Sequence, residues 1–336
     1  MTISIIGAIA ALTLAAVTST LLIWLAKPLL IRYAMARPNA RSSHRTPTPQ
    51  GAGLAVISAT MAAAAVILSI YGLAFPTPLL TALVLMASVG LADDLRPIPV
   101  LPRLLLQGFA VAIVVFSMPE TVRLFQIIPL MLERCLVLLA GLWFVNLVNF
   151  MDGLDWITVA EVVPVTAALV LYGLLEKISP LTAIICASLC GAMLGFAPFN
   201  RPPAKVFLGD VGSLPIGLLL GWCLLELAQH RFAAAMLLPM YYIADATVTL
   251  LRRLINGERV WVAHRSHFYQ RATDNGFTVG AVVKELFVLN VGLAALATAS
   301  LVAHSAVLDF LLVLFGGIVV ALQLRRFSRS RKNLCT

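Results

Sequence analysis

The sequence predicts an all-α, polytopic integral membrane protein. Of its 336 residues, 61% are hydrophobic and only 12% are charged, and the mean hydropathy is +0.98. A soluble domain has about 45–50% apolar and about 25% charged residues, so this chain lacks the polar side chains needed to cover a water-soluble core. The same apolar content excludes a disordered chain. Because a helical span takes about 20 residues, the length allows about ten or eleven membrane helices.

Apolar runs between polar loops place eleven helices. Their expected ranges are 3–30, 53–74, 77–92, 101–118, 128–148, 157–175, 180–197, 212–229, 232–251, 281–303 and 306–324. The first run has no basic segment before it and no convincing cleavage site, so we expect a retained span and not a removed signal peptide. The whole chain, 1–336, is expected to be one integral membrane catalytic domain that ends in a basic cytoplasmic tail, 325–336.

The basic residues predict the orientation of the helices. Eighteen of them fall on one side, in the loops 31–52, 96–103, 201–205 and 252–271 and in the tail. Four fall on the other side, namely Arg123, Arg134, Lys177 and Arg231. Because cytoplasmic loops carry the excess of Lys and Arg, we expect the N-terminus outside and the C-terminus in the cytoplasm. The net charge of +9 then reflects topology, and no nucleic-acid partner is expected.

Six aspartates lie at the predicted cytoplasmic ends of the helices: Asp93, Asp94, Asp152, Asp155, Asp210 and Asp245. Acids often only cap helix ends, but aspartate pairs inside almost purely apolar flanks favour a functional site. Neighbouring carboxylates raise each other's pKa unless a cation lies between them, and hard oxygen ligands suit Mg²⁺ or Mn²⁺. Arg and His in the same loops are natural contacts for phosphate. The pattern therefore predicts a cytoplasmic, metal-dependent site for a phosphorylated substrate.

Five motifs occur in order along the chain. They are Pro38 to Gly51, the pair Asp93-Asp94, the segment Asn146-x-x-Asn149-Phe-x-Asp152-Gly-x-Asp155, the segment Phe207-Leu-Gly-Asp210-Val-Gly-Ser213, and His264-Arg265-Ser266-His267. Their order and spacing resemble the polyprenyl-phosphate N-acetylhexosamine-1-phosphate transferases, also called glycosyltransferase family 4. The resemblance runs from about residue 30 to 275.

The resemblance implies that a UDP-N-acetylhexosamine donates its sugar 1-phosphate to undecaprenyl phosphate, with release of UMP and a requirement for Mg²⁺. Two phosphate groups of like charge must approach each other, so a metal and cationic side chains must neutralise them. The family's metal ligands match Asn149 and Asp210. A helix C-cap is the structural alternative for Asn149.

The resemblance also assigns expected roles to further residues. Asp93, Asp94, Asp152 and Asp155 are expected to be catalytic, although a lipid phosphate whose second pKa is about 6 needs little help from a general base. The expected substrate-binding residues are Arg41, His44, Arg103, Asn146, Asp245, His264, Arg265 and His267. For Arg103, snorkelling to the membrane interface is an equal alternative to a contact with the lipid phosphate.

The loop 252–280 indicates which branch of the family this chain resembles. The peptidoglycan branch carries a run of adjacent histidines there, whereas this chain has His264-Arg265-Ser266-His267. It therefore looks more like the branch that starts O-antigen or teichoic-acid synthesis. GlcNAc and 6-deoxy N-acetylhexosamines remain open as the sugar, and a homodimer is compatible with the sequence. A transporter or lipid flippase is the alternative function, but transporters usually place polar groups near the bilayer midplane, and the span centres here are apolar.

Overall fold

The structure is a computed structural model that describes residues 3–36, 47–259, 261–262, 264–303 and 305–330. In these ranges it contains thirteen α-helices and two strands of two residues each. They are α1 (Ile5–Tyr33), β1 (Met35–Ala36), β2 (Thr48–Pro49), α2 (Gly53–Ile70), α3 (Thr77–Leu95), α4 (Val100–Ser117), α5 (Leu130–Met151), α6 (Ile157–Leu174), α7 (Pro180–Asn200), α8 (Asp210–His230), α9 (Phe232–Leu237), α10 (Met240–Ile255), α11 (Phe268–Asp274), α12 (Val279–Ala303) and α13 (Ala306–Phe327). The predicted all-α membrane fold is confirmed.

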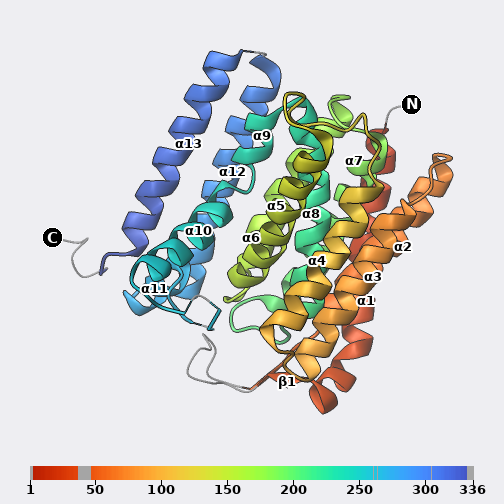
Figure 1. Cartoon of the computed structure of the whole chain (residues 1–336). Helices are drawn as coiled ribbons and strands as arrows, with labels where there is room; N and C mark the ends of the chain where they lie inside the picture. The colour runs from red at the N-terminus through yellow and green to blue at the C-terminus, as the bar shows by residue number, and fades with distance from the viewer. Residues whose placement is uncertain (1–2, 37–46, 260, 263, 304, 331–336) are drawn as a thin grey trace.

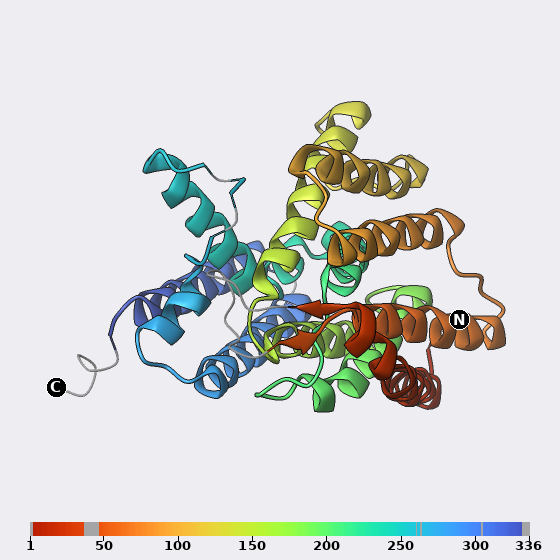
Figure 2. The same ribbon diagram turned by 90° about the horizontal axis from the view of Figure 1, so that it is seen from below.

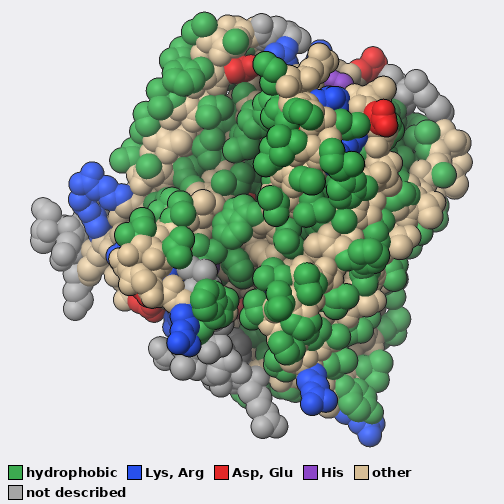
Figure 3. All heavy atoms as spheres, viewed as in Figure 1, with side chains coloured by type: hydrophobic (Ala, Val, Ile, Leu, Met, Phe, Trp, Pro, Cys, Tyr) green, Lys and Arg blue, Asp and Glu red, His purple; other side chains and the backbone are tan. Residues whose placement is uncertain are grey.

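Ten of the described helices are long and apolar enough to cross a membrane: all except α9, α10 and α11. The long helices α1 to α8 run in alternate directions, α9 and α10 then return the chain to the end where α8 began, and α12 and α13 cross the bundle once more in each direction (Figure 1). The start of α1 and the end of α13 therefore lie at opposite ends of the bundle (Figure 1). Hydrophobic side chains cover the middle of the molecule, whereas charged side chains gather toward the two ends (Figure 3). We call the end that carries β1, β2, α11 and the loops after α3, α5, α7 and α10 the loop end.

The centre of the bundle is formed by α7 and α8. In their span segments, 78% and 72% of the residues are buried, against 17% in α13 at the edge. The helix α7 packs against α1, α2 and α6, while α8 packs against α3 and α5. Because α8 is enclosed by other helices, its first residue, Asp210, opens into a space bounded by protein.

The predicted ninth span, 232–251, is wrong as a single helix. The chain breaks at Leu238 and Pro239 into the six-residue α9 and the sixteen-residue α10. Proline has no amide hydrogen and its ring clashes with the preceding turn, so a helix is interrupted there. Seen from the loop end, α10 projects away from the packed helices (Figure 2). Its outer part exposes the apolar side chains of Leu254 and Ile255.

Two small features fix the loop end. The strands β1 and β2 pair antiparallel, and the backbone that follows β2 bonds to the loop before α8, with Gly53 N donating to Leu208 O at 2.8 Å. Glycine is needed at this crossing, because a Cβ on Gly53 would lie 2.2 Å from the Cα of Gly212. The close contact of α2 with α8 therefore depends on two residues without side chains.

Candidate active site

The first turn of α8 is held by Asp94, the next-to-last residue of α3. The carboxylate oxygens of Asp94 accept hydrogen bonds from the backbone amides of Asp210 (3.0 Å) and Val211 (3.1 Å). Such amides have no partner inside the helix, and the helix dipole favours a negative charge beside them. Gly90 permits the approach, because a Cβ there would lie 2.3 Å from the Asp210 carbonyl oxygen. Asp94 thus joins the end of α3 to the start of α8.

Arg103, in the first turn of α4, lies between two of the predicted aspartates. Its Nη1 is 2.9 Å from Oδ2 of Asp93 and 3.6 Å from Oδ2 of Asp210. Asp93 also accepts a 2.7 Å hydrogen bond from the backbone amide of Ile98. Arg103 therefore points into the carboxylate cluster and offsets its charge, so snorkelling toward the interface does not describe its position.

Asn149, near the end of α5, meets Asp210 directly. Its Nδ2 donates to Oδ1 of Asp210 at 2.8 Å and to Oγ of Ser213 at 2.9 Å. The two residues that the resemblance assigns to the metal thus lie side by side. Asn149 is also inside α5, which ends at Met151, so the helix C-cap alternative does not apply to it.

Asp152 follows directly after α5 and faces the same cluster. Its carboxylate accepts a hydrogen bond from the hydroxyl of Thr158. Burial, assisted by repulsion from Asp210, Asp94 and Asp155, raises the pKa of Asp152 to about 8. A carboxyl group with this pKa is mostly protonated at pH 7 unless a cation approaches it.

The loop after α5 is tied to the loop after α7. Oδ2 of Asp155 accepts a hydrogen bond from the backbone amide of Ala204 at 2.9 Å, and Oδ1 of Asn200 accepts one from the amide of Trp156 at 2.7 Å. These bonds close one wall of the site. Asp155 thus fixes the loop after α7 and also lines the smaller of the two cavities described below.

Asn146 lies one turn before Asn149 on α5 and is 5% exposed. Its Nδ2 donates to Oε1 of Gln107 on α4 at 2.9 Å and to the carbonyl oxygen of Leu142 at 2.8 Å. Its side chain therefore links α5 to α4 while it lines the larger cavity described below.

Asp245 on α10 is completely buried. Its carboxylate faces five donor groups at 2.9–3.2 Å: the Tyr241 and Thr249 hydroxyls, Nδ1 of His267, and the backbone amides of Phe268 and Tyr269. The last two amides begin α11, so Asp245 caps this short helix and orients His267. Asp245 is a positioning residue in this arrangement, because it has no exposed surface that a substrate could reach.

The two histidines of the last motif lie together. Their rings stack with centroids 4.9 Å apart, and both line the larger cavity. Burial, with repulsion from His267 and Arg253, lowers the pKa of His264 to about 4. His264 is therefore neutral at pH 7 and does not contribute a positive charge to the site.

Arg265 points elsewhere. Its Nη2 is 3.1 Å from Oγ1 of Thr273 and 3.2 Å from Oδ1 of Asp274, both in α11. It lines neither of the two cavities that reach the carboxylate cluster. Within the described part of the chain, Arg265 thus contributes to the structure of α11.

Two cavities meet at the carboxylate cluster. The larger, about 890 Å³, is lined by Asp93, Val100, Arg103, Leu104, Leu139, Leu142, Trp143, Asn146, Asn149, Phe150, Asp210, Leu250, Trp261, Val262, His264, His267 and Gln270. The smaller, about 280 Å³, is lined by Ala36, Gln50, Asp94, Asn149, Asp152, Gly153, Leu154, Asp155, Asn200, Phe207, Leu208, Gly209, Asp210, Gln270 and Val279. The residues common to both linings are Asn149, Asp210 and Gln270, so these three mark the junction.

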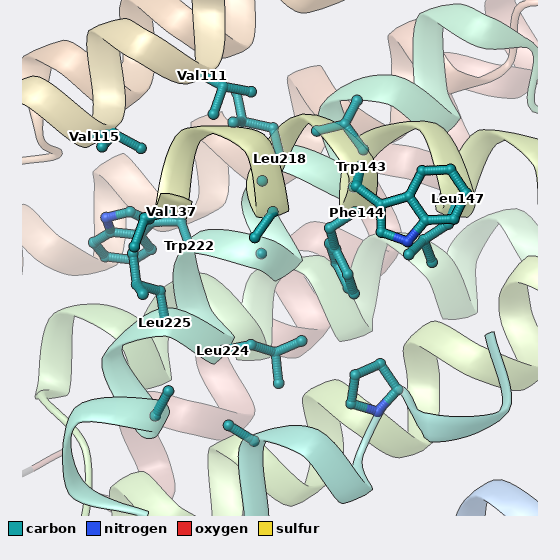
Figure 4. Close-up of a pocket in the computed structure, with 18 of the residues that line it drawn as sticks. Val111, Val115, Val137, Trp143, Phe144, Leu147, Leu218, Trp222, Leu224 and Leu225 are labelled. Carbon is teal, nitrogen blue, oxygen red and sulfur yellow. The ribbon is translucent and has the colours of Figure 1, made fainter. Parts of the chain in front are cut away.

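A third cavity, of about 340 Å³, lies deeper in the bundle and is almost entirely apolar. Side chains of α4, α5 and α8 surround it, among them Val111, Phe144 and Trp222 (Figure 4). Trp143 lines this cavity and the larger one above. Apolar surface therefore continues from the carboxylate cluster into the membrane part of the protein.

The predicted site residues include two that the structure does not describe, and they omit one residue that lines both cavities. Arg41 and His44 lie outside the described residues. Gln270 was not predicted, because a single glutamine after the His267 motif carries no signal of its own. The other predicted residues except Asp245 and Arg265 line one of the two site cavities.

The donor set around Asp210 is consistent with a hard divalent cation. Within the described residues, no group of three or more His, Cys, Asp or Glu side chains has the arrangement of a complete metal site. Mg²⁺ does not need one, because it is usually bound by one or two carboxylates together with substrate phosphates. The carbonyl oxygen of Asn149 and the carboxylate of Asp210 are two hard oxygen donors in this site that could hold such an ion.

These features define a polytopic membrane protein with a carboxylate-rich site at one end of its helix bundle. Residues 76–228, which include Asp93, Asp152 and Asp210, match the model of glycosyl transferase family 4. This segment, a little under half of the chain, is thus similar to that family.

Curated relatives share this partial similarity. The chain is similar to the phospho-N-acetylmuramoyl-pentapeptide-transferases of Francisella tularensis subsp. novicida (strain U112) and Francisella philomiragia subsp. philomiragia. Each is 34% identical over 136 residues, which cover 34% of this chain and 37% of the relative. The match thus spans little more than a third of the length of these relatives.

Proposed function

We propose that this protein transfers an N-acetylhexosamine 1-phosphate from a UDP-sugar to undecaprenyl phosphate and releases UMP. One observation carries the proposal: Asn149 and Asp210 lie where a small polar cavity meets a larger cavity that is lined by apolar side chains. A water-soluble phosphate donor and a lipid phosphate acceptor need two such entrances to one charged centre.

The smaller cavity suits the nucleotide. Gly153 and Gly209 leave backbone close to its interior, and Asp155 and Asn200 place polar atoms in its wall. The ring of Phe207 offers a surface on which a base can stack. The diphosphate of the donor would then extend toward Asp210, at the junction.

The larger cavity suits the lipid phosphate. Leu104, Leu139 and Trp143 form an apolar wall that leads from Arg103 toward the membrane interior. A polyprenyl chain can lie along such a wall while its phosphate reaches Arg103. The guanidinium group would neutralise that phosphate as it approaches the donor.

The reaction then requires few steps from the protein. An oxygen of the lipid phosphate attacks the β-phosphorus of the donor, and the bond from this phosphorus to the bridging oxygen breaks as UMP leaves. Asn149 and Asp210 would hold Mg²⁺, which neutralises the diphosphate and the developing charge on UMP. Arg103 holds the acceptor, and Asp94 positions Asp210 through the first turn of α8. The lipid phosphate is already largely dianionic at neutral pH, so we assign no general base.

We further propose that the branch is that of O-antigen or teichoic-acid initiation. The motif His264-Arg265-Ser266-His267 supports this choice, since it lacks a run of adjacent histidines. GlcNAc and 6-deoxy N-acetylhexosamines are the proposed sugars. The proposed location is the bacterial inner membrane, with the loop end in the cytoplasm, where nucleotide sugars are made.

A detergent-solubilised assay tests the proposal. The purified chain is mixed with undecaprenyl phosphate, Mg²⁺ and each of a panel of UDP-N-acetylhexosamines, and released UMP is measured. We expect UMP and a lipid-linked sugar diphosphate with one of them. A transporter or flippase would bind the substrates without forming UMP, so the absence of UMP with every donor would contradict the proposal.

A further inference from the structure

We propose that Gln270 recognises the sugar of the donor by accepting a hydrogen bond from an N–H or O–H group on it. The inference rests on the proposed function and adds a residue that determines sugar specificity. The observation behind it is that one buried oxygen of Gln270 has no hydrogen-bond partner in the part of the chain that the structure describes.

Gln270 is almost completely buried, with 7% of its surface exposed. Its Oε1 has no hydrogen-bond partner among the described residues. Buried polar atoms are nearly always paired in native proteins, so an unpaired one calls for an explanation. A ligand that brings a donor group into the site would provide the missing partner.

The position of Gln270 indicates which ligand this is. Gln270, Asn149 and Asp210 are the residues that line both site cavities. Nδ2 of Asn149 donates a hydrogen bond to Oδ1 of Asp210 at 2.8 Å. If the nucleotide occupies the smaller cavity and the β-phosphate lies beside Asp210, the hexose attached to that phosphate must lie at the same junction.

The backbone that carries Gln270 is anchored in this place. The two residues before it, Phe268 and Tyr269, donate their backbone amides to the buried carboxylate of Asp245 at 3.0 Å. The hydroxyl of Tyr269 donates to the carbonyl oxygen of Phe150 at 2.9 Å. A buried side chain on an anchored backbone can discriminate between ligands, because it has little room to move when a group on the ligand is missing.

An amide oxygen accepts hydrogen bonds and cannot donate them, which limits the groups on the ligand that can pair with it. The oxygens of an ionised diphosphate are acceptors and cannot pair with Oε1 of Gln270. On the sugar, the groups that can pair with it are the acetamido N–H and the hydroxyls of the hexose. The ribose hydroxyls and the uracil N–H are donors too, but the proposed arrangement places the nucleoside in the smaller cavity, on the far side of the diphosphate from the hexose. A metal ion is the other partner that an amide oxygen can take, and the experiment separates it from the sugar.

The experiment compares two variants and one control in the full-length chain in lipid nanodiscs. Gln270→Met keeps the length of the side chain but removes the amide oxygen, and Gln270→Glu keeps an acceptor. Gln229→Met is the matched control, because Gln229 lies near the far end of α8 from the site. For each protein, kcat, KM and the Mg²⁺ concentration for half-maximal rate are measured with the preferred UDP-sugar and with analogues that lack the acetamido group or one hydroxyl.

We expect Gln270→Met to lower kcat/KM for the preferred sugar by about 10–100-fold and to lower it for one of the analogues by less than about threefold. The ratio of kcat/KM between the preferred sugar and that analogue then falls toward one. The group that the analogue lacks is the group that Gln270 recognises. Gln270→Glu should keep the preference, and Gln229→Met should match the unmodified protein. A purely structural role would reduce the rates for all sugars together.

Two results would overturn the inference. An unchanged preference in Gln270→Met excludes sugar recognition, and a shift in the Mg²⁺ requirement with an unchanged preference assigns Gln270 to the metal. If the unmodified protein forms no UMP with any donor, the proposed function fails separately. Thermal stabilisation by UDP-sugar relative to UDP then still tests Gln270, because Gln270→Met should abolish the difference, and persistence of the difference would count against the inference.

Discussion

Asn149 on α5 and Asp210 at the start of α8 are joined by a 2.8 Å hydrogen bond, although 61 positions separate them in the chain. The bond places an amide and a carboxylate side by side at the junction of the two cavities. Asp94 supports the pair from α3 through the backbone amide of Asp210. The helices α3, α5 and α8 thus meet at Asp210.

Replacing Asp210 with Asn should lower kcat by about 10²–10³-fold while the protein remains folded in the membrane. The variant keeps an oxygen that can accept the hydrogen bond from Asn149, but it loses the charge that attracts a divalent cation. UMP release at limiting and saturating Mg²⁺ measures the effect. Asp309→Asn, near the opposite end of the bundle, is the control and should retain activity. Near-normal turnover of Asp210→Asn at limiting Mg²⁺ would show that Asp210 is not a metal ligand.

The pH dependence should follow Asp152, whose pKa is raised to about 8. Below pH 8 its carboxyl group is mostly protonated, so a cation must displace a proton to bind beside it. At limiting Mg²⁺, kcat/KM should therefore rise with pH up to about 8 and then level off. Saturating Mg²⁺ should move this rise to lower pH, because the cation stabilises the ionised form. If Asp152→Asn retains the same rise, another group is responsible for it.

Replacing Asp245 with Asn should loosen α11 without removing any group that lines the cavities. The amide side chain carries one acceptor oxygen where the carboxylate has two, so the backbone amides of Phe268 and Tyr269 cannot both keep their bonds. Hydrogen bonds to a charged group contribute about 1.5–3 kcal/mol each, so these amides should exchange with deuterium about 10–100 times faster. Asp274→Asn is the control, because Asp274 is exposed and pairs only at the surface with Arg265. Unchanged exchange in Asp245→Asn would disprove the capping role.

Replacing Gly153 with Ala should displace Tyr269 from the loop after α5. A Cβ at this position would lie 2.2 Å from the Tyr269 hydroxyl oxygen, a contact that forces the side chains apart. Overpacking of this kind costs about 1–3 kcal/mol, which should appear as a lower melting temperature and reduced UMP release. Removing the hydroxyl with Tyr269→Phe in the Gly153→Ala background should restore part of the melting temperature and part of the UMP release. A double variant no better than Gly153→Ala would argue against this contact.

A reporter fused after Thr336 should be cytoplasmic. The basic residues concentrate at the loop end, and the positive-inside rule places such loops in the cytoplasm. A reporter that is active in the cytoplasm and one that is active in the periplasm give opposite signals when fused at the same site. A periplasmic signal would reverse the proposed orientation and move the site away from the nucleotide sugar.

Much of the fold could be read from local sequence. Long apolar runs can be stable only inside a membrane or a protein core, so the ten continuous span helices followed from composition and spacing. The ninth span failed at Pro239, where one residue outweighed the hydrophobic pattern around it. The short helix α11 was also missed, because its seven residues depend on the buried Asp245 more than on their own pattern.

The chain by itself determined which chemical groups are available, because aspartates are rare in this apolar sequence and stand out at the ends of its helices. Only the tertiary structure decided how these groups are used. It paired Arg103 with Asp93 and Asp210, buried Asp245 as an anchor for α11, and placed Gln270 at the junction of the two cavities. The physical reason is that each of these roles depends on contacts between distant helices, and the close packing at Gly53, Gly90 and Gly153 that permits such contacts leaves no periodic pattern in the sequence.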